Sequence, residues 1–448
     1  MKKLIIIAML VLTSTMAISQ TSVWHGGKTI WTRGSGTEYD PFLIETADNL
    51  AFLAYVVNKG YSTSGMYFLL TTDIDLNGSE DQPWIPIGLG DRYFSEDGCN
   101  RGKFQDFSSF FNGYFDGGEH SISNIYVNSE DMVGGLFGAA CGVNADSLAV
   151  IENVFVTNGF IKGSDCGGIL GKCLGFVLVS RCWNGATIEG ENVGGIVGWW
   201  GNKIHNCFNK GNLSGKSVGG IAGFVAKEII ECYNDGNITA SSFGGGIIGR
   251  NQGRAVIDNC YNTASVSANG ESYYVTAGGL LGGGTLDSIT NCYSTGEVSG
   301  NNIIGCLVGF NMSNVFVGNS YYLNTCTESE FGEPKSEDYM RSQEFVDYLN
   351  GRNRDLVWAM DEDNVNNGFP ILAEDNLVVE ELPEYTFEIY PNPASGMFVV
   401  EGTGMVTVSN VLGQTILVRE IDGQTSVALP SGMYFVRLGN VTQKVVVK

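Results

Sequence analysis

The chain has 448 residues, with 25 Lys or Arg against 48 Asp or Glu, and its formal net charge of −23 argues against nucleic acid and anionic lipid as partners. Its hydrophobic content of 43% is enough for a full core, which excludes a chain that is disordered throughout. The 62 glycines follow no three-residue period, which excludes collagen.

Residues 1–19 have the pattern of a secretory signal peptide. Met1-Lys2-Lys3 is a basic start, and the apolar run Leu4–Leu12 is too short to span a bilayer. Small residues precede the expected cleavage between Ser19 and Gln20, so we expect the mature chain to begin at Gln20. No later segment reaches about 18 consecutive apolar residues, and the sequence therefore predicts no transmembrane helix.

Residues 20–130 are predicted to form an N-terminal cap that covers the open backbone edge of the domain behind it. A helix is expected from Ala47 to about Asn58, because Thr46 can cap its start. Asp73 and Asp75 lie two apart on a predicted strand and share a face, so they could bind Ca²⁺ together with Asp116. The alternative, which we favour, is that the three carboxylates cap turns by accepting backbone amide hydrogens.

Two motifs recur with one irregular period in residues 131–326. The first is a glycine pair followed by two apolar residues and a third glycine; successive copies start 25 to 33 residues apart. Its five clean copies begin with Gly167-Gly168, Gly194-Gly195, Gly219-Gly220, Gly245-Gly246 and Gly278-Gly279. The second motif is a cysteine followed by an aromatic residue and then Asn or Ser, at Cys182, Cys207, Cys232, Cys260 and Cys292. Two motifs with a shared period indicate a repeat architecture.

Each repeat holds three strand-sized apolar runs separated by Asn and Gly, which fits one coil of a parallel β-helix. We therefore predict an all-β fold with a right-handed parallel β-helix of about seven coils. Stacked coils place like residues in columns, and the glycine pair leaves room where the chain turns close to the next coil. Ile204 and Cys207 are both apolar although three residues apart, so we expect a bend at Asn206.

The 11 cysteines leave two interpretations open. Stacked coils place the five repeated cysteines within disulfide distance of one another. We favour a buried ladder of reduced thiols, since free Cys packs as a small apolar residue. One pair could be bridged among the less regular cysteines, which are Cys99, Cys141, Cys166, Cys173, Cys306 and Cys326.

The repeats resemble the GLUG motif, which occurs in secreted bacterial surface proteins and in some immunoglobulin-cleaving metallopeptidases. The resemblance covers residues 134–309, and residues 20–130 resemble the region commonly found ahead of such repeats. It implies a β-helix stalk and no particular chemistry.

Residues 327–384 are predicted to hold a capping helix over 335–350 and then an acidic linker, Glu374–Glu384. Residues 385–448 alternate apolar and polar residues in seven short runs between turn residues, which predicts a small antiparallel, immunoglobulin-like β-sandwich.

This tail resembles the C-terminal sorting domain of the type IX secretion system of Bacteroidetes. The residues that carry the resemblance are Tyr390, Pro391, Asn392, Pro393, Gly413, Gly432, Tyr434, Lys444 and Lys448. It implies that the secretion machinery and a sortase-like peptidase are partners, that the tail is removed, and that the protein is attached covalently to lipopolysaccharide. The expected location is the outer-membrane cell surface or the extracellular space. An ordinary immunoglobulin-like appendage is the alternative.

Candidate catalytic residues are scattered. None of His25, His120 and His205 belongs to an HExxH motif, and no motif for a metal or another cofactor is present. Arg181, Glu231 and Asp258 fall one or two residues before a repeated cysteine and predict a charged stripe, either part of an active site or, as we favour, a solvated face. An aromatic column would bind sugars if exposed, although we expect core packing; it comprises Trp183, Phe208, Tyr233, Tyr261 and Tyr293.

The sequence therefore predicts a secreted, non-catalytic β-helix protein, attached to the cell surface, that adheres to or interacts with host or extracellular-matrix components. The alternative is a β-helix that binds or degrades polysaccharide, as a lyase or glycosidase. An enzyme would show one polar cluster confined to a few adjacent coils, whereas an adhesin would show a diffuse face.

Overall fold

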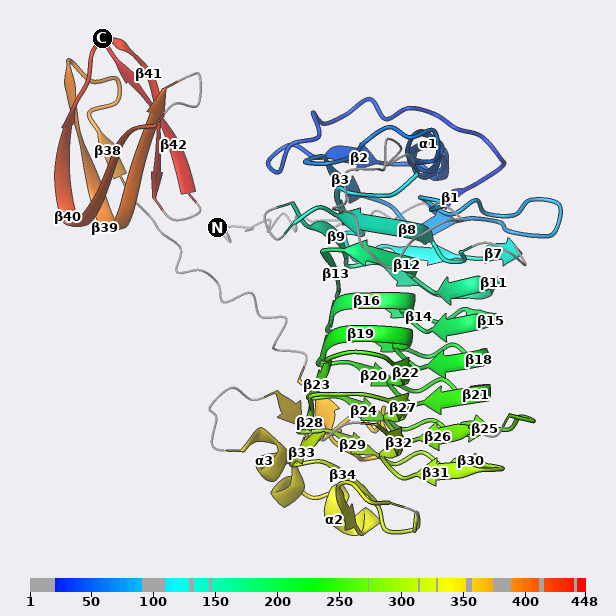
Figure 1. The fold of residues 1–448 in the computed structure, drawn as a ribbon. Coiled ribbons are helices and arrows are strands. Elements are labelled where there is room, and N and C mark those ends of the chain that lie inside the picture. Colours follow the sequence, from blue (N-terminus) through cyan, green and yellow to red (C-terminus); the bar gives the residue numbers. More distant parts are fainter. Residues whose placement is uncertain are drawn as a thin grey trace, which may run out of the picture. The chain divides into compact units, whose positions relative to one another are not determined.

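The computed structural model describes residues 21–90, 109–128, 133–144, 147–272, 274–312, 315–327, 329–351, 357–373, 388–410, 415–438 and 441–448. The chain divides into two compact units, Met1–Leu372 and Ala373–Lys448. The first unit is a parallel β-solenoid of about nine turns, and the second is a small antiparallel β domain (Figure 1). The all-β class and the parallel solenoid predicted from the repeats are confirmed.

Each full turn of the solenoid adds strands to three parallel sheets, which we call sheets 1, 2 and 3. Sheet 1 contains β1 (Ser22–Val23), β4 (Ile74–Asp75), β6 (Ser121–Ser123), β10 (Phe155–Val156), β14 (Trp183–Asn184), β17 (Phe208–Asn209), β20 (Tyr233–Asn234), β24 (Tyr261–Asn262), β29 (Tyr293–Ser294), β34 (Tyr321–Leu323) and β35 (Glu333–Lys335). Sheet 2 contains β7 (Ile125–Asn128), β11 (Gly159–Gly167), β15 (Thr187–Gly194), β18 (Leu213–Gly219), β21 (Ile238–Gly245), β25 (Val266–Ala268), β26 (Thr276–Gly278), β30 (Val298–Gly300) and β31 (Ile303–Gly305).

Sheet 3 has the most strands of the three, with 15 in the described residues. It contains β2 (Phe42–Ile44), β3 (Tyr67–Leu70), β5 (Tyr114–Asp116), β8 (Phe137–Gly142), β9 (Ala149–Glu152), β12 (Leu170–Gly175), β13 (Val177–Ser180), β16 (Val197–His205), β19 (Ala222–Ile230), β22 (Ile248–Asn251), β23 (Val256–Asp258), β27 (Leu281–Gly284), β28 (Ser288–Thr290), β32 (Val308–Asn311) and β33 (Phe316–Gly318). In Figure 1 the bands of sheet 3 lie beside the arrows of sheet 2 in turn after turn.

Two corners of each turn follow directly from the motifs. Between sheets 3 and 1, the residue before each repeated cysteine takes a left-handed conformation, with φ between 50° and 53° from Arg181 to Asn291. The expected bend at Asn206, with φ of 53°, is one of these. Between sheets 2 and 3, the glycine pair turns the chain around an apolar residue that lies in the core. These residues are Ile169, Ile196, Ile221, Ile247 and Leu280, and each is fully buried. Burying one such side chain stabilises the fold by about 1.5–3 kcal/mol.

The N-terminal region contributes turns of its own to the solenoid. β2, β3 and β5 pair in parallel with one another, and β5 pairs with β9, so sheet 3 is continuous from Phe42 onward. The predicted count of about seven coils was too small because these early turns lack the glycine pair. Helix α1 (Ala47–Asn58) forms as expected: the Thr46 side chain accepts a hydrogen bond from the Asn49 backbone N–H, and Leu50 and Leu53 are fully buried.

The predicted helix over 335–350 is two helices, α2 (Glu337–Met340) and α3 (Gln343–Asn350). The break lies at Ser342, whose side chain accepts a hydrogen bond from the Phe345 backbone N–H and caps α3. A short antiparallel pair follows, formed by β36 (Trp358–Ala359) and β37 (Ile371–Leu372). The acidic linker predicted for 374–384 lies outside the described residues, as do residues 1–20.

The described residues of the second unit form five strands in place of the seven short ones predicted. They are β38 (Glu388–Tyr390), β39 (Met397–Asn410), β40 (Thr415–Ala428), β41 (Gly432–Leu438) and β42 (Val441–Val447). Two pairs of expected strands are fused, because the ladder between β39 and β40 runs on through Gly402 and its partner Gly423. One half of β39 pairs with β38 and the other half with β41, around a core that includes Phe398 and Val436.

Candidate functional site

A ladder of buried asparagines runs inside the solenoid next to the glycine pairs. The side-chain Nδ2 of Asn184 donates to Oδ1 of Asn209 at 2.8 Å, and the same bond links Asn209 to Asn234 and Asn234 to Asn262. A β-carbon on Gly195 would lie 2.1 Å from the Gly220 carbonyl oxygen and 2.5 Å from Asn209. The second glycine of the pair therefore makes room for this ladder. The ladder was not predicted, although an Asn follows the aromatic residue in the first four repeats and is its signal in the sequence.

The five repeated cysteines form a second interior ladder. The backbone N–H of Cys182 donates to Sγ of Cys207 at 3.4 Å, and the pattern repeats along the column until Ser320 Oγ accepts from the Cys292 N–H. All five are buried free thiols. Burial raises the pKa of Cys182, Cys232 and Cys292 well above the ordinary value. A thiol that stays protonated is a packing group and a poor nucleophile.

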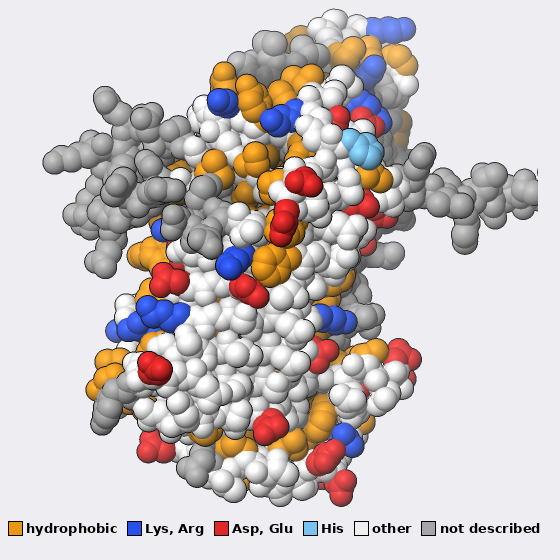
Figure 2. All heavy atoms as spheres, turned by 90° about the vertical axis from the view of Figure 1, so that its right-hand side faces the viewer, with side chains coloured by type: hydrophobic (Ala, Val, Ile, Leu, Met, Phe, Trp, Pro, Cys, Tyr) orange, Lys and Arg blue, Asp and Glu red, His pale blue; other side chains and the backbone are white. Residues whose placement is uncertain are grey.

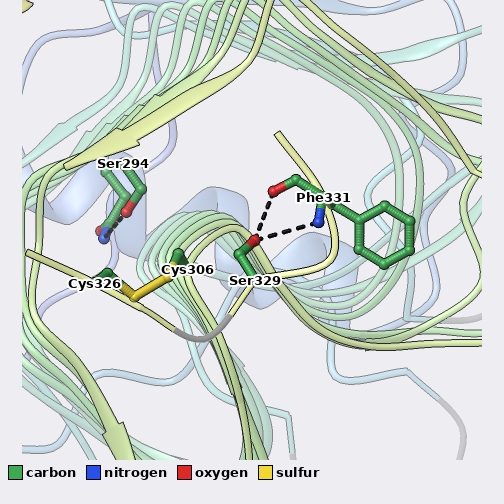
Figure 3. The surroundings of a disulfide bond; sticks show 6 residues. Ser294, Cys306, Cys326, Ser329 and Phe331 are labelled. Carbon is green, nitrogen blue, oxygen red and sulfur yellow. Dashed lines mark hydrogen bonds between the residues drawn. A yellow bond between two sulfur atoms is a disulfide. The ribbon is translucent and has the colours of Figure 1, made fainter. Parts of the chain in front are cut away.

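Two of the less regular cysteines form a disulfide. Cys306 is bonded to Cys326 at the C-terminal end of the solenoid (Figure 3). Cys306 stands where the second glycine of the pair stands in earlier coils, and its bond holds the turn that follows β34. Cys141 is also disulfide-bonded, whereas Cys166 and Cys173 are free and buried; Cys99 lies outside the described residues.

The three aspartates considered for Ca²⁺ are not brought together. Asp73 accepts a hydrogen bond from the Ser121 backbone N–H at 2.8 Å, which is the main cause of its lowered pKa. Asp75, in sheet 1, accepts from the Asn77 N–H, and Asp116, in sheet 3, accepts from the Gly118 N–H. These contacts are those of turn caps. The part of the chain that the structure describes holds no group of three or more His, Cys, Asp or Glu suited to a metal ion.

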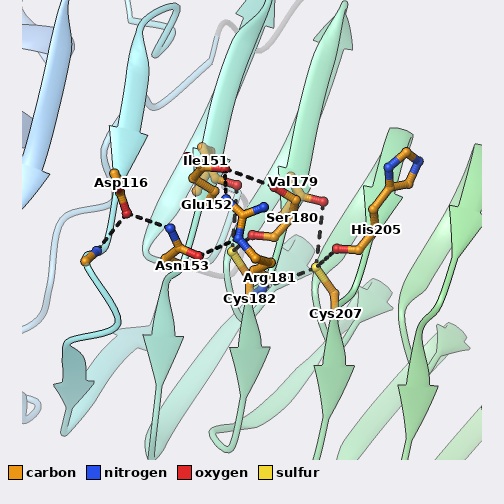
Figure 4. A network of polar contacts seen from close by, with 11 residues as sticks. Asp116, Ile151, Glu152, Asn153, Val179, Ser180, Arg181, Cys182, His205 and Cys207 are labelled. Atoms are coloured by element: carbon orange, nitrogen blue, oxygen red, sulfur yellow. Dashed lines mark hydrogen bonds and ion pairs between the residues drawn. The ribbon is translucent and has the colours of Figure 1, made fainter. Parts of the chain in front are cut away.

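The predicted charged stripe lies at the corner between sheets 3 and 1. Each of its members forms a hydrogen bond or an ion pair with a side chain of an adjacent coil, as Arg181 shows in Figure 4. Arg181 forms an ion pair with Glu152 and donates from Nε to Asn153 Oδ1 at 2.7 Å. Asn153 in turn donates to Asp116 at 2.8 Å. Further along the corner, Glu231 accepts from Asn206 Nδ2, Asp258 accepts from Asn291 Nδ2, and His205 contacts Glu228 at 2.7 Å. The charged groups thus hold adjacent coils together.

The aromatic column lies on the outer face of sheet 1, and the expected core packing holds for Tyr261 and Tyr293 alone, which are buried in a hydrophobic cluster under the C-terminal cap. From Trp183 to Tyr293 the rings stack with interplanar angles of 3° to 7° and centroids 4.7 to 5.6 Å apart. Phe345 and Trp358 of the C-terminal cap cover Tyr293, which is fully buried. The other end of the column, at Trp183 and Phe208, is only half-buried. Trp183, Phe208 and Tyr233 therefore form an aromatic strip on the outer surface.

A second row of outward-facing residues lies on sheet 3, one residue after the last glycine of each repeat motif. This row was not predicted. In register along the sheet it comprises Lys172, Trp199, Phe224, Arg250, Gly283 and Phe310. The Lys172 Nζ lies 4.3 Å from the Trp199 ring centroid. Beside this row a hollow of about 140 Å³ is lined by Glu191, Asn192, Lys216, Ser217, Phe224, Phe243 and Arg250. We call this hollow the Arg250 groove. The signal in the sequence is the recurrence of an aromatic or basic residue at one repeat position, at which Gly283 is the exception.

The outer face of sheet 2 is different in character. Figure 2 shows a surface that is mostly uncharged, with acidic and basic side chains dispersed over it. One outward row of this sheet comprises Lys162, Glu189, Ser214, Thr239, Ser267 and Ser299. A shallow hollow of about 570 Å³ lies over Lys162, Glu189 and Ser214.

In the second unit, the residues quoted for the sorting resemblance tie the first strand to the last. Asn392 donates from Nδ2 to the Lys444 carbonyl oxygen at 2.7 Å and accepts from the Val446 N–H at 3.1 Å. The Tyr434 hydroxyl donates to the Pro430 carbonyl oxygen at 3.0 Å, and the Tyr390 hydroxyl donates to Glu401 at 2.6 Å. Gly413 lies outside the described residues.

The fold and this tail together define an exported β-solenoid protein. Residues 388–448 match the family described as "Secretion system C-terminal sorting domain". The tail is thus a type IX sorting domain. It indicates that the protein interacts with the secretion machinery and is exported to the cell surface or the extracellular space. The match covers the tail alone, and the resemblance of the repeats to the GLUG motif stays a prediction.

Two curated proteins are similar to part of the chain. A stretch of 167 residues, 37% of this chain, is 29% identical to Halomucin of Haloquadratum walsbyi. A stretch of 158 residues, 34% of this chain, is 31% identical to a "Putative Gly-rich membrane protein" of Evansella cellulosilytica. The aligned stretches span 2% and 15% of the lengths of these two relatives. In the described ranges, no helix of this chain is long and apolar enough to cross a membrane.

Proposed function

We propose that this protein is a non-catalytic interaction rod of a bacterial cell surface that adheres to host or extracellular-matrix components. The observation that carries the proposal is the aromatic strip of Trp183, Phe208 and Tyr233, held outside the core of an exported solenoid. The coil repeat already holds these rings in a stack. Binding a ligand to their apolar surface therefore costs little further side-chain conformational entropy. The dispersed charges on sheet 2 are those of a diffuse binding face (Figure 2).

The charged stripe supports a non-catalytic role. A general acid or base needs a carboxyl or imidazole free to exchange a proton with substrate. Glu152, Glu231 and Asp258 each accept hydrogen bonds from side chains of adjacent coils, as members of the corner that holds the solenoid together. We further propose that residues 1–19 are a signal peptide, that a sortase-like peptidase removes the tail, and that the mature protein is linked to lipopolysaccharide of a Bacteroidetes cell.

The test is adhesion of cells that export the full chain to immobilised matrix proteins and glycans. Trp183→Ser is expected to reduce adhesion several-fold while the protein remains exported and folded. Phe316→Ser is the matched control, because Phe316 is 64% exposed and lies outside the strip. Adhesion that is equal in the variant and the parent, or no greater than that of cells without the protein, would overturn the proposal.

A further inference from the structure

Arg250 has no anionic partner among the described residues of a strongly acidic protein. Its guanidinium lies 4.7 Å from the Phe243 ring centroid and 5.5 Å from that of Phe224. No carboxylate or other hydrogen-bonding group of the described residues pairs with it. The neighbouring cations differ, since Lys172 lies 3.8 Å from Asp165 and Lys216 lies 3.7 Å from Glu191. The two rings thus fix a planar, charged group whose N–H donors are unused.

The Arg250 groove also offers polar groups. Asn192 donates to Asp165 from Nδ2, which leaves its carbonyl oxygen as an acceptor beside the groove. In sheet 2, Thr276 lies beside Phe243 on the adjacent strand and is fully buried, and its hydroxyl has no hydrogen-bond partner among the described residues. A β-carbon on Gly283 would lie 3.1 Å from this hydroxyl and 3.0 Å from Phe243. The row therefore has no side chain at Gly283, because the Phe243 ring and the Thr276 hydroxyl leave little room there for a β-carbon.

The spacing of the row favours a sugar chain over a peptide. Consecutive members of the row lie on adjacent strands, about 4.8 Å apart. A pyranose ring in an extended, β-linked polysaccharide advances by a similar distance, so successive rings can meet successive coils. An extended peptide advances by about 3.3 Å per residue and falls out of step with the coils.

We propose that the Arg250 groove is a subsite for an acidic polysaccharide, in which the Arg250 guanidinium binds the carboxylate of a uronic acid. The ring faces of Trp199 and Phe224 pack against sugar rings on the preceding coils, and Asn192 accepts from a sugar hydroxyl. A guanidinium binds a carboxylate through two parallel N–H···O bonds, which a lysine cannot form. The inference rests on the proposed function, because it names the chemical class of one surface ligand.

The experiment is calorimetric titration of the purified mature chain with an oligomannuronate, which is a β-1,4-linked uronic acid oligomer, and with a β-1,4-linked cello-oligosaccharide of the same length. The acidic oligomer is expected to bind, more weakly as salt is raised, and the neutral one to bind at least about tenfold more weakly. Arg250→Met keeps apolar packing on Phe224 and Phe243 and is expected to lose at least about tenfold in affinity. Arg250→Lys is expected to lie between the two, and Arg254→Met, which changes a side chain that is 91% exposed, is the matched control.

Four results would overturn the inference: unchanged binding by Arg250→Met, equal binding of the neutral oligomer, binding of polyglutamate but not of the oligomannuronate, or inorganic sulfate binding as tightly as the oligomer. Adhesion of cells that export Arg250→Met separates the two proposals. If the purified chain does not bind the oligomer and cells still adhere, this inference fails and the interaction rod stands. If the oligomer binds at Arg250 and cells do not adhere, the surface-adhesion role fails and the subsite stands.

Discussion

At the residue scale, each interior asparagine joins its own turn to the coils on both sides. Asn209 donates from Nδ2 to the Gly211 carbonyl oxygen and to Asn234 Oδ1, both at 2.8 Å, and accepts from Asn184. Asn209→Ala leaves these buried groups unpaired, and we expect it to lower the free energy of unfolding by about 2–4 kcal/mol. Urea titration of the mature chain followed by circular dichroism measures the change.

The control for this prediction is Asn212→Ala, which changes an exposed asparagine of the same turn and should cost less than about 0.5 kcal/mol. Asn209→Ser should be milder than Asn209→Ala, since Ser294 takes the same place two coils beyond Asn234 and accepts from Asn262. Equal stability of Asn209→Ala and Asn212→Ala would show that the ladder is not a source of stability.

The thiols give a prediction about reactivity. Burial raises the pKa of the Cys173 thiol to about 12, and it raises that of Cys166 further. Since only the thiolate reacts, Cys166 and Cys173 should resist a disulfide reagent at pH 8 and react only as urea unfolds the chain. The control is Thr239→Cys, which places a thiol on the exposed face of sheet 2 and should react rapidly in the folded protein. Rapid labelling of Cys173 in the folded protein would contradict this.

At the element scale, the repeat period predicted each coil because the motifs encode its corners. Glycine is needed where a β-carbon would strike the next coil, as at Gly195, and such a constraint is visible in sequence. The sequence predicted a separate cap for the early coils because these coils lack the glycine-pair motif. Phe68 and Phe115 fill their core instead. The half-buried end of the aromatic column was misplaced because alternation alone does not tell which face of a two-residue strand such as β17 points inward.

The disulfide gives a prediction about the last element of the solenoid. Cys306–Cys326 closes a loop with a sequence separation of 20, which stabilises the native state by about 3 kcal/mol. Cys326→Ser should therefore speed hydrogen exchange in β31 and β34, while β15 in the middle of the rod keeps its protection. Thr325→Ala, an exposed neighbour, should leave the exchange of all three strands unchanged. Equal exchange in the two variants would mean that the cap alone holds this end.

At the scale of the whole molecule, sequence patterns predicted the solenoid and the sorting tail but not the Arg250 groove. The groove depends on which residues from three coils meet across a corner, and on Arg250 having aromatic neighbours but no carboxylate paired with it among the described residues. Phe243 lies seven residues before Arg250 on a different sheet, so their contact is a property of the folded corner. The tail was recognisable because its turn residues lie close together in sequence.

The sorting domain carries the last prediction, which concerns export of the whole chain. Asn392 joins the Tyr390–Pro393 segment to β42 through Lys444 and Val446. Loss of both bonds should loosen this edge, so Asn392→Ala is expected to lower the amount of protein on the surface of intact cells several-fold, and a chain that ends at residue 384 should not reach it at all. Protease shaving of intact cells with mass spectrometry measures the surface form, and Val418→Ala, at an exposed position of β40, is the control. Surface protein at the parental level from the chain that ends at residue 384 would show that the tail does not direct export.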